Sequence, residues 1–364
     1  MTSYAKSNGG NLYIRNAGDG ILSIINVKVV GGGTPSVNTR MILDALKLFQ
    51  GFSETPIADD GLPIYHSLNL ASDISVNYVV PQSALEDIQD SYMTVTLPVY
   101  EGNTLAGSRE VRLSPELRDG MFYYTLEGLT AVDMNDLIYA QLHYLRDGEH
   151  YVSAEDEYSI ADYAYSQLGK STNSHSLKAL CAQLLRYGTQ AQIYKGYRTD
   201  ALADALLSEE QRAYLTDLEQ VPFGNVNETL TQIEAPTVTW IGKALNLESR
   251  VSVLFVVDPS HYEGSVDELS LRVKYTDSLG EEIIAVLEKG SIYNEKYLSF
   301  SFDRLTAAEL RSVLEVSVYA EEQQLSQTLR YSADTYCNGK TGDLLSLCQA
   351  LFAYVDSAEA YFKE

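Results

Sequence analysis

An internal repeat constrains the fold of this chain more than any other sequence feature. Segments 68–80 and 245–257 align without a gap, and eight of their thirteen positions are identical. Three more matching blocks follow in the same order, and the offset drifts only from 177 to 167. Chance similarity would not keep four blocks in register. We therefore expect a tandem duplication in which each copy forms one structural unit.

The last shared block predicts a long amphipathic helix in each copy. Its shared positions fall at i, i+3, i+4, i+7, i+10, i+14 and i+17, which is one face of an α-helix. The stripe consists of Leu177, Leu180, Cys181, Leu184, Tyr187, Ala191 and Tyr194 in the first copy, and of Leu344, Leu347, Cys348, Leu351, Tyr354, Ala358 and Tyr361 in the second. We expect each helix to dock on the core of its own unit.

The earlier blocks alternate apolar and polar residues, as in 269–275 and 314–318. This alternation is typical of half-buried antiparallel strands. The predicted strands lie near 73–80, 92–99, 108–114, 121–126, 137–145 and 150–158 in the first copy, and near 250–257, 268–275, 281–287, 296–302, 313–320 and 325–332 in the second. Short strands at this spacing indicate a sandwich rather than a βαβ fold.

The predicted fold class is mainly β with α (α+β). It consists of two tandem immunoglobulin-like antiparallel sandwiches, each followed by a packed amphipathic helix. Short helices at 161–168 and 333–338 precede the long ones. The expected domains are a β-hairpin at 1–34 that forms the tail of a preceding domain, a helix and linker at 35–60, a first sandwich–helix unit at 61–218, a linker at 219–237, and a second unit at 238–364.

Two segments outside the repeats carry their own signals. Residues 11–15 and 21–30 predict two strands around the tight turn Gly18-Asp19-Gly20. Residues 36–50 have the apolar spacing of a short helix, and Ser208 to Gln211 have the pattern of a capping box.

The charge of the chain excludes some partners. It has 26 Lys and Arg against 50 Asp and Glu, so its formal net charge is −24. Such a chain repels phosphate backbones and anionic lipid surfaces, and we expect no nucleic-acid partner. No apolar run in the sequence is long enough to cross a bilayer, so we expect no membrane insertion.

The sequence carries no common catalytic signature. Gly-x-Ser-x-Gly, His-Glu-x-x-His, Cys-x-x-Cys and a Gly-rich phosphate loop are all absent from it. The residues that could do chemistry fall where the two copies disagree. We therefore expect no enzymatic activity and no cofactor, and we leave loosely bound calcium open.

The histidines and acidic clusters are weak candidates. His143 and His150 flank a turn and could hold a metal across a hairpin, but no third ligand has a recognisable spacing. Two solvated surface histidines are the simpler interpretation. The clusters at 59–60 and 155–157 are interpreted as solvated loops.

The three cysteines do not suggest a nucleophile. Cys181 and Cys348 lie on the apolar helix stripe, where a buried thiol stays inert. Cys337 could bond to Cys348, but the first copy has Ala164 at the matching position. We favour three free core thiols and leave a Cys337–Cys348 disulfide open.

Aromatic residues are the remaining candidates for binding. The chain has 27 Tyr, 9 Phe and 1 Trp, and exposed aromatic planes can stack on sugar rings. Trp240 and Tyr197 are the candidate ligand-binding residues, and the junction between the copies near 221–240 is the expected place. The structural alternative is that Trp240 caps the core just before the first strand of the second copy.

The shared motifs resemble a module of large secreted or surface proteins of gut clostridia. They are Leu-Asn-Leu-x-x-x-(Ile/Val)-Ser-Val-x-(Tyr/Phe), Tyr-Ser-x-x-x-Tyr, and Leu-Leu-Arg-Tyr-Gly-Thr-Gln-Ala-Gln-Ile-Tyr ending at Tyr194. The resemblance covers about 62–218 and 238–363. It implies an extracellular or cell-surface location within a longer polypeptide, often beside sugar-active or dockerin modules.

Two functions of different classes follow. The first is a non-catalytic extracellular or cell-surface module for spacing, display or binding, with a glycan or a host or surface protein as partner. The alternative is the accessory C-terminal region of a carbohydrate-active enzyme whose catalytic domain lies outside this chain. A free-standing enzyme is disfavoured because no catalytic constellation is present in the sequence.

Overall fold

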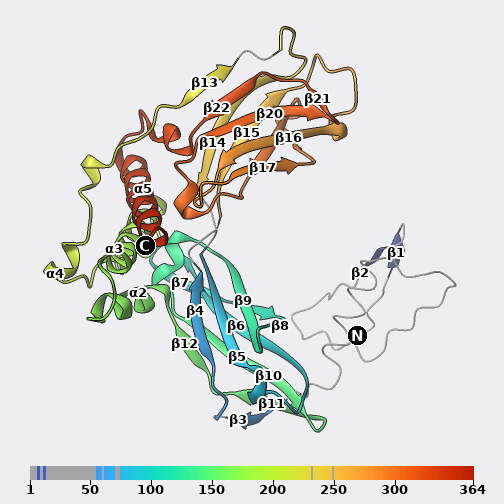
Figure 1. The fold of residues 1–364 in the computed structure, drawn as a ribbon. Helices are drawn as coiled ribbons and strands as arrows, with labels where there is room; N and C mark the ends of the chain where they lie inside the picture. The colour runs from blue at the N-terminus through green and yellow to red at the C-terminus, as the bar shows by residue number, and fades with distance from the viewer. Residues whose placement is uncertain are drawn as a thin grey trace.

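The computed structural model describes residues 6–8, 11–13, 55–59, 61–69, 74–230, 233–247 and 250–364. The chain is mainly β and forms two sandwiches, with the long helices beside the place where the sandwiches meet (Figure 1). The predicted helix at 36–50 and the predicted strand at 21–30 lie outside the described residues.

The first sandwich contains two sheets. Its strands are β3 (Ile57–Asp59), β4 (Tyr65–Asn69), β5 (Ile74–Pro81), β6 (Ile88–Glu101), β7 (Thr104–Leu113), β8 (Glu116–Arg118), β9 (Met121–Leu129), β10 (Ile138–Arg146), β11 (Glu149–Ser153) and β12 (Asp156–Tyr158). One sheet has the order β3-β11-β10-β6-β7, with β12 also paired to β10, and the other has the order β4-β5-β9-β8. All pairs are antiparallel except β3 with β11.

The second sandwich repeats this arrangement. Its strands are β13 (Asn227–Leu230), β14 (Thr239–Leu247), β15 (Val251–Asp258), β16 (Leu269–Thr276), β17 (Glu282–Leu287), β18 (Ser291–Tyr293), β19 (Tyr297–Phe302), β20 (Leu314–Ala320), β21 (Gln323–Gln324) and β22 (Thr328–Tyr331). The sheets have the orders β13-β22-β20-β16-β17 and β14-β15-β19-β18, with β21 also paired to β20. The four-stranded sheets of the two sandwiches therefore match strand for strand.

The crossover between the sheets is fixed in the same way in both sandwiches. A 3-10 helix, η2 (Ala131–Asn135), follows β9, and another, η5 (Ala307–Glu309), follows β19. The backbone N–H of Thr130 donates to the Asp133 carboxylate at 2.7 Å, and the N–H of Thr306 donates to the Glu309 carboxylate at 2.9 Å. Each is half of a capping box, which satisfies a backbone donor at the start of the turn.

A serine breaks the last strand of each sandwich. The hydroxyl of Ser153 accepts a hydrogen bond from the backbone N–H of Leu142 at 2.9 Å, and Ser326 accepts one from Val318 at 2.8 Å. The hydroxyl thus replaces the carbonyl that a continuous partner strand would offer. The strand predicted at 150–158 is therefore split into β11 and β12, whereas the strand predicted at 325–332 corresponds to β22 alone, because β21 ends at Gln324.

The described residues contain four helices, and the first three begin at a serine whose side chain accepts a backbone hydrogen bond. They are α2 (Ile160–Gly169), α3 (His175–Lys195), α4 (Glu209–Arg212) and α5 (Gly342–Phe362). Ser174 caps the start of α3, and Gly196 ends it in the left-handed conformation with φ of 64°. The capping box predicted at Ser208 is confirmed. The predicted helix at 333–338 is a 3-10 helix, η6 (Ala333–Cys337).

Helices α3 and α5 pack against each other as an antiparallel pair. The rings of Tyr187 and Tyr354, which occupy matching positions in the two copies, stack with centroids 6.0 Å apart and an interplanar angle of 11°. Near the start of α3, the Ser176 hydroxyl donates to Glu364 at 2.5 Å. We expected each helix to dock on its own unit, and the structure shows in addition that the two helices pack against each other.

The middle of the helix stripe is buried as predicted, whereas its end residues Leu177, Leu344 and Tyr361 are half-buried. Leu180 and Leu347 are 1% and 3% exposed, and Tyr187 and Tyr354 are also buried. Tyr194 is 42% exposed, so its predicted burial was wrong. Tyr194 lies in the last turn of α3, two residues before the Gly196 cap.

Two segments predicted as linkers contribute strands. Strand β13 lies within the predicted linker 219–237 and pairs with β22, and β3 lies within 35–60 and pairs with β11. Both add to a sheet edge through backbone hydrogen bonds, which need no apolar pattern. Farther toward the N-terminus, β2 (Asn11–Tyr13) pairs with β1 (Lys6–Asn8), upstream of it rather than downstream as predicted.

The three cysteines are free and buried. Burial raises the pKa of Cys181 to about 12. Cys337 and Cys348 are hydrogen-bonded to each other, which raises the pKa of Cys337 and lowers that of Cys348.

We predict that Leu180→Ala and Leu347→Ala each lower the free energy of unfolding by about 2–5 kcal/mol, because each leaves a cavity in the helix packing. Urea denaturation followed by circular dichroism measures the loss. Leu206→Ala is the control, since Leu206 is 80% exposed and should change stability little. Equal stability of Leu347→Ala and Leu206→Ala would contradict this packing.

Candidate functional site

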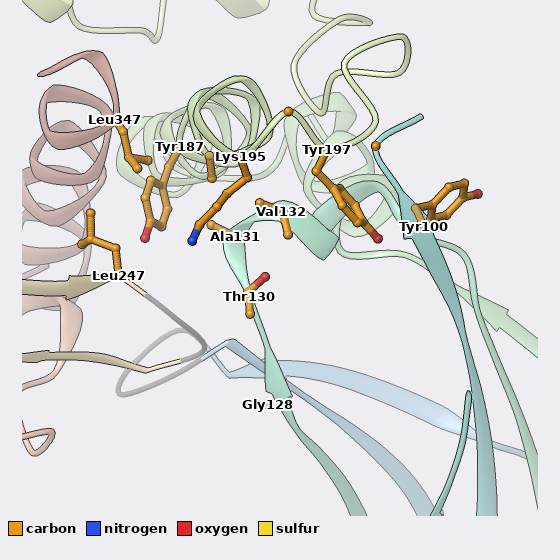
Figure 2. Close-up of a pocket in the computed structure, with 13 residues that line it drawn as sticks. Tyr100, Gly128, Thr130, Ala131, Val132, Tyr187, Lys195, Tyr197, Leu247 and Leu347 are labelled. Carbon is orange, nitrogen blue, oxygen red and sulfur yellow. The ribbon is translucent and has the colours of Figure 1, made fainter. Parts of the chain in front are cut away.

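A pocket of about 560 Å³ opens where the end of α3 meets the second sandwich (Figure 2). We call it the junction pocket. Its walls come from the β6–β7 turn, the end of β9 with η2, the end of α3, the end of β14 and the start of α5. The lining residues are Tyr100, Gly102, Gly128, Thr130, Ala131, Val132, Tyr187, Ala191, Lys195, Gly196, Tyr197, Leu247 and Leu347.

The loop after α3 is anchored to the β6–β7 turn, and this contact shapes one wall. The N–H of Arg198 donates to the Gly102 carbonyl at 3.0 Å, and the N–H of Thr199 donates to the Asn103 side chain at 2.8 Å. Gly102 has φ of 61°, a conformation that glycine adopts without strain. The two segments lie almost a hundred residues apart, so the wall depends on the tertiary fold.

A buried ion pair holds Tyr197 in place. The Tyr197 hydroxyl donates to Asp136 at 2.6 Å, and Arg198 donates to the other oxygen of that carboxylate, also at 2.6 Å. Asp136 is 3% exposed, and burial raises its pKa more than the two hydrogen bonds lower it. Arg198 also lies over the ring of Tyr100 at 4.5 Å, and Tyr100 meets Tyr197 edge to face at 5.8 Å.

Lys195 and Tyr187 form the other end of the pocket. Figure 2 shows the Lys195 ammonium and the Tyr187 hydroxyl both directed into the pocket, in the space between Leu247 and Ala131. Burial raises the pKa of Tyr187, so its hydroxyl stays protonated and can donate a hydrogen bond. Lys195 is the last residue of α3, where a cation favours the helix dipole.

A smaller pocket of about 250 Å³ lies at the opposite end of the helix pair. We call it the end pocket, and its lining residues are Ser278, Leu279, Thr306, Ala308, Glu359, Phe362 and Lys363. Several of them align with junction-pocket residues when the two similar halves of the sequence are compared. Thr306 matches Thr130, and Phe362 matches Lys195. The two pockets thus share some matching wall positions, but the side chains at other matching positions differ in polarity and charge.

The structure separates the two residues predicted to bind a ligand. Tyr197 lines the junction pocket, whereas Trp240 does not. Trp240 is half-buried inside β14, not before the first strand as predicted. Its indole N–H donates to the Gln327 carbonyl at 2.9 Å, and its ring meets Phe255 edge to face at 6.1 Å. These contacts are those of a core-packing residue.

The two histidines lie beside each other as predicted, but their predicted exposure to solvent was wrong. His143 Nδ1 lies 3.0 Å from His150 Nε2, but His150 is buried and His143 is half-buried, so neither is a solvated surface residue. The ring of His143 also stacks on Tyr92 at 4.7 Å. In the part of the chain that the structure describes, no group of three His, Cys, Asp or Glu side chains could hold a metal ion.

The acidic clusters are more structured than the solvated loops we expected. Asp59 accepts a hydrogen bond from the Tyr144 hydroxyl, which lowers the pKa of Asp59. Asp156 lies 2.5 Å from the ring nitrogen Nε2 of His66. Both carboxylates therefore hold strands of the first sandwich together.

The sequence did not identify Tyr100, Tyr187 or Lys195 as binding residues. Tyr187 carried a helical signal that indicated only burial, and Tyr100 and Lys195 carried no periodic signal. The one available clue was that Lys195 directly follows Tyr194, the last residue of the predicted helix stripe.

Comparisons with known proteins leave the family open. No protein-family model and no curated protein matches this sequence. Among solved structures, it matches a glycoside hydrolase family 64 laminaripentaose-producing β-1,3-glucanase from Paenibacillus barengoltzii at 11% identity and a TM-score of 0.19, over 76% of this chain and 53% of that one. It also matches astrotactin-2, a vertebrate-specific perforin-like membrane protein, at 10% identity and a TM-score of 0.17, over 70% and 50%.

These matches establish neither a shared fold nor a family, because their TM-scores are too low. The chain spans about half the length of the structures that it matches.

Among the helices of the described residues, none is long and apolar enough to cross a membrane.

We predict that Arg198→Met lowers the free energy of unfolding by about 3 kcal/mol, because it leaves the buried Asp136 carboxylate without its cation. Urea denaturation measures the change. The double variant Arg198→Met/Asp136→Asn removes the buried charge as well and should recover part of the loss. A single variant as stable as the parent would show that the pair is solvated.

We predict that His143 makes the protein less stable in acid. Burial, His150 and Arg112 lower the pKa of His143 from 6.5 to about 4. The unfolded chain therefore binds more protons between these values, so stability falls as the pH drops from about 6.5 to about 4. Because the side chain is partly exposed, we expect His143 to contribute about 1–2 kcal/mol of this loss.

Thermal unfolding of the parent and of His143→Gln across this pH range measures that contribution. His143→Gln should show a shallower loss, and His261→Gln, which changes an exposed histidine, should follow the parent. Parallel pH profiles for all three proteins would refute a buried neutral His143.

Proposed function

We propose that this chain is a non-catalytic extracellular or cell-surface binding module whose junction pocket takes a carbohydrate. In this proposal the sandwiches are immunoglobulin-like and arose by tandem duplication. The observation that carries the proposal is the junction pocket. Its walls present tyrosine rings and polar groups that have no hydrogen-bond partner among the described residues. The extracellular location rests on the sequence resemblance to secreted and surface modules.

The size and surface of the pocket favour a sugar ligand. A volume of about 560 Å³ falls within the range of small-molecule sites, which is roughly 300–1,000 Å³. Tyr100 and Tyr187 offer hydroxyls that have no hydrogen-bond partner among the described residues. Sugars combine apolar ring faces with many hydroxyls, and tyrosine provides an apolar plane together with a polar tip.

The lining chemistry favours binding over catalysis. Glycoside hydrolysis uses a pair of carboxylates on either side of the scissile bond. No Asp, Glu, His, Cys or Ser is present among the thirteen lining residues that the structure describes. Lys195 and the tyrosines can orient a ligand, but no nucleophile stands beside a general base there.

We predict that a glycan bound by the intact chain loses about tenfold in affinity in Tyr100→Ala, because the variant removes a ring and a hydroxyl from the pocket wall. A glycan array selects the ligand, and isothermal titration calorimetry measures its Kd. Tyr65→Ala is the matched control, since Tyr65 is an exposed tyrosine of β4 outside the pocket.

The same samples test for catalysis. We expect the oligosaccharide to remain intact after long incubation, so that an assay for reducing ends detects no new ones. Turnover by the parent chain, or equal affinity loss in both tyrosine variants, would contradict a non-catalytic site in the junction pocket.

A further inference from the structure

We propose that the ligand of the junction pocket is an acidic sugar, such as a uronic acid residue, and that Lys195 binds its carboxylate. This inference rests on the proposed function and narrows it to one chemical class. In this proposal the two ends of the pocket contact different parts of the ligand. Lys195 and Tyr187 contact the charged group, and Tyr100 and Tyr197 contact the sugar ring.

The charge of the pocket differs from that of the chain. The protein carries a formal net charge of −24, with about two acidic residues for each basic one. Among the described lining residues of the junction pocket, Lys195 is the single charged side chain, and it is a cation. A pocket of this kind attracts an anion locally on a surface that otherwise repels it.

Lys195 is available to a ligand. Within the described residues its ammonium has no carboxylate partner, and its one recorded contact is with the ring of Tyr194 at 6.0 Å. Other exposed lysines of this protein do have partners, such as Lys274 with Glu282 at 2.7 Å. The favourable position at the end of α3 explains a basic residue there, but not its direction into the pocket (Figure 2).

The end pocket shows that the fold does not need a lysine at this position. The residue that matches Lys195 is Phe362, which also lines a pocket beside a capping threonine. The threonine itself is the same in both, because Thr130 and Thr306 cap the same 3-10 turn. The threonine that caps the turn is thus the same at both pockets, whereas the matching residue that faces the pocket is Lys195 in one and Phe362 in the other.

Tyr187 can add a second donor to the same carboxylate. Its hydroxyl is directed into the pocket on the side of Lys195 (Figure 2) and stays protonated because burial raises its pKa. Its ring is held by the stack on Tyr354, so little side-chain entropy is lost when a ligand binds. An ammonium and a hydroxyl together match the two oxygens of one carboxylate.

The test compares an acidic oligosaccharide with its own neutral form. A uronic acid oligosaccharide and the same oligosaccharide with its carboxyl groups reduced to primary alcohols are titrated into the intact chain by calorimetry. The variants are Lys195→Gln and, as the matched control, Lys178→Gln, which removes a lysine from the same helix outside the pocket. Titrations at low and high salt measure the ionic share of binding.

We expect the parent to bind the acidic form about tenfold more tightly than the neutral form. Lys195→Gln should abolish this preference and its salt dependence while still binding the neutral form, and Lys178→Gln should behave as the parent. Equal binding of both forms, or an unchanged preference in Lys195→Gln, overturns the inference and leaves the proposed function standing. Binding of neither form overturns both.

Discussion

The stack of Tyr187 on Tyr354 is the contact on which the rest of this arrangement depends. The two rings come from matching positions of α3 and α5, and both are buried. The contact is reciprocal, because Cys348 lies near Tyr187 and Cys181 lies near Tyr354. Such exchange of equivalent partners is the property of an interface with two-fold symmetry, here formed within one chain.

This helix pair determines where both pockets lie. Antiparallel packing brings the end of α3 to the start of α5, so Lys195 and Leu347 share one pocket. The same packing leaves the end of α5 beside η5, where Phe362 and Thr306 share the other. A change in the helix contact would therefore alter both pockets, although neither contains the whole contact.

The sequence predicted the helices and strands whose burial on one face leaves a periodic pattern of apolar residues. The stripe through Leu180 and Leu347 and most strands were identified because burial on one face leaves a spacing of 3.6 or 2. Strand β13 was missed because it is held by backbone hydrogen bonds at a sheet edge. The junction pocket was missed for another reason, since Tyr100, Lys195 and Leu247 meet only in the folded chain. Tyr197 was singled out for its aromatic character and lies there, whereas Trp240 packs in the core.

The pairing of α3 with α5 also sets the order in which the chain can complete its fold during synthesis. The stripe of α3 is made before the whole second sandwich, and its partner helix follows that sandwich. Until α5 emerges from the ribosome, the Tyr187 side of α3 has no cover from its partner. While the second sandwich is being synthesised, that apolar side of α3 therefore stays uncovered, and uncovered apolar surface favours misassembly.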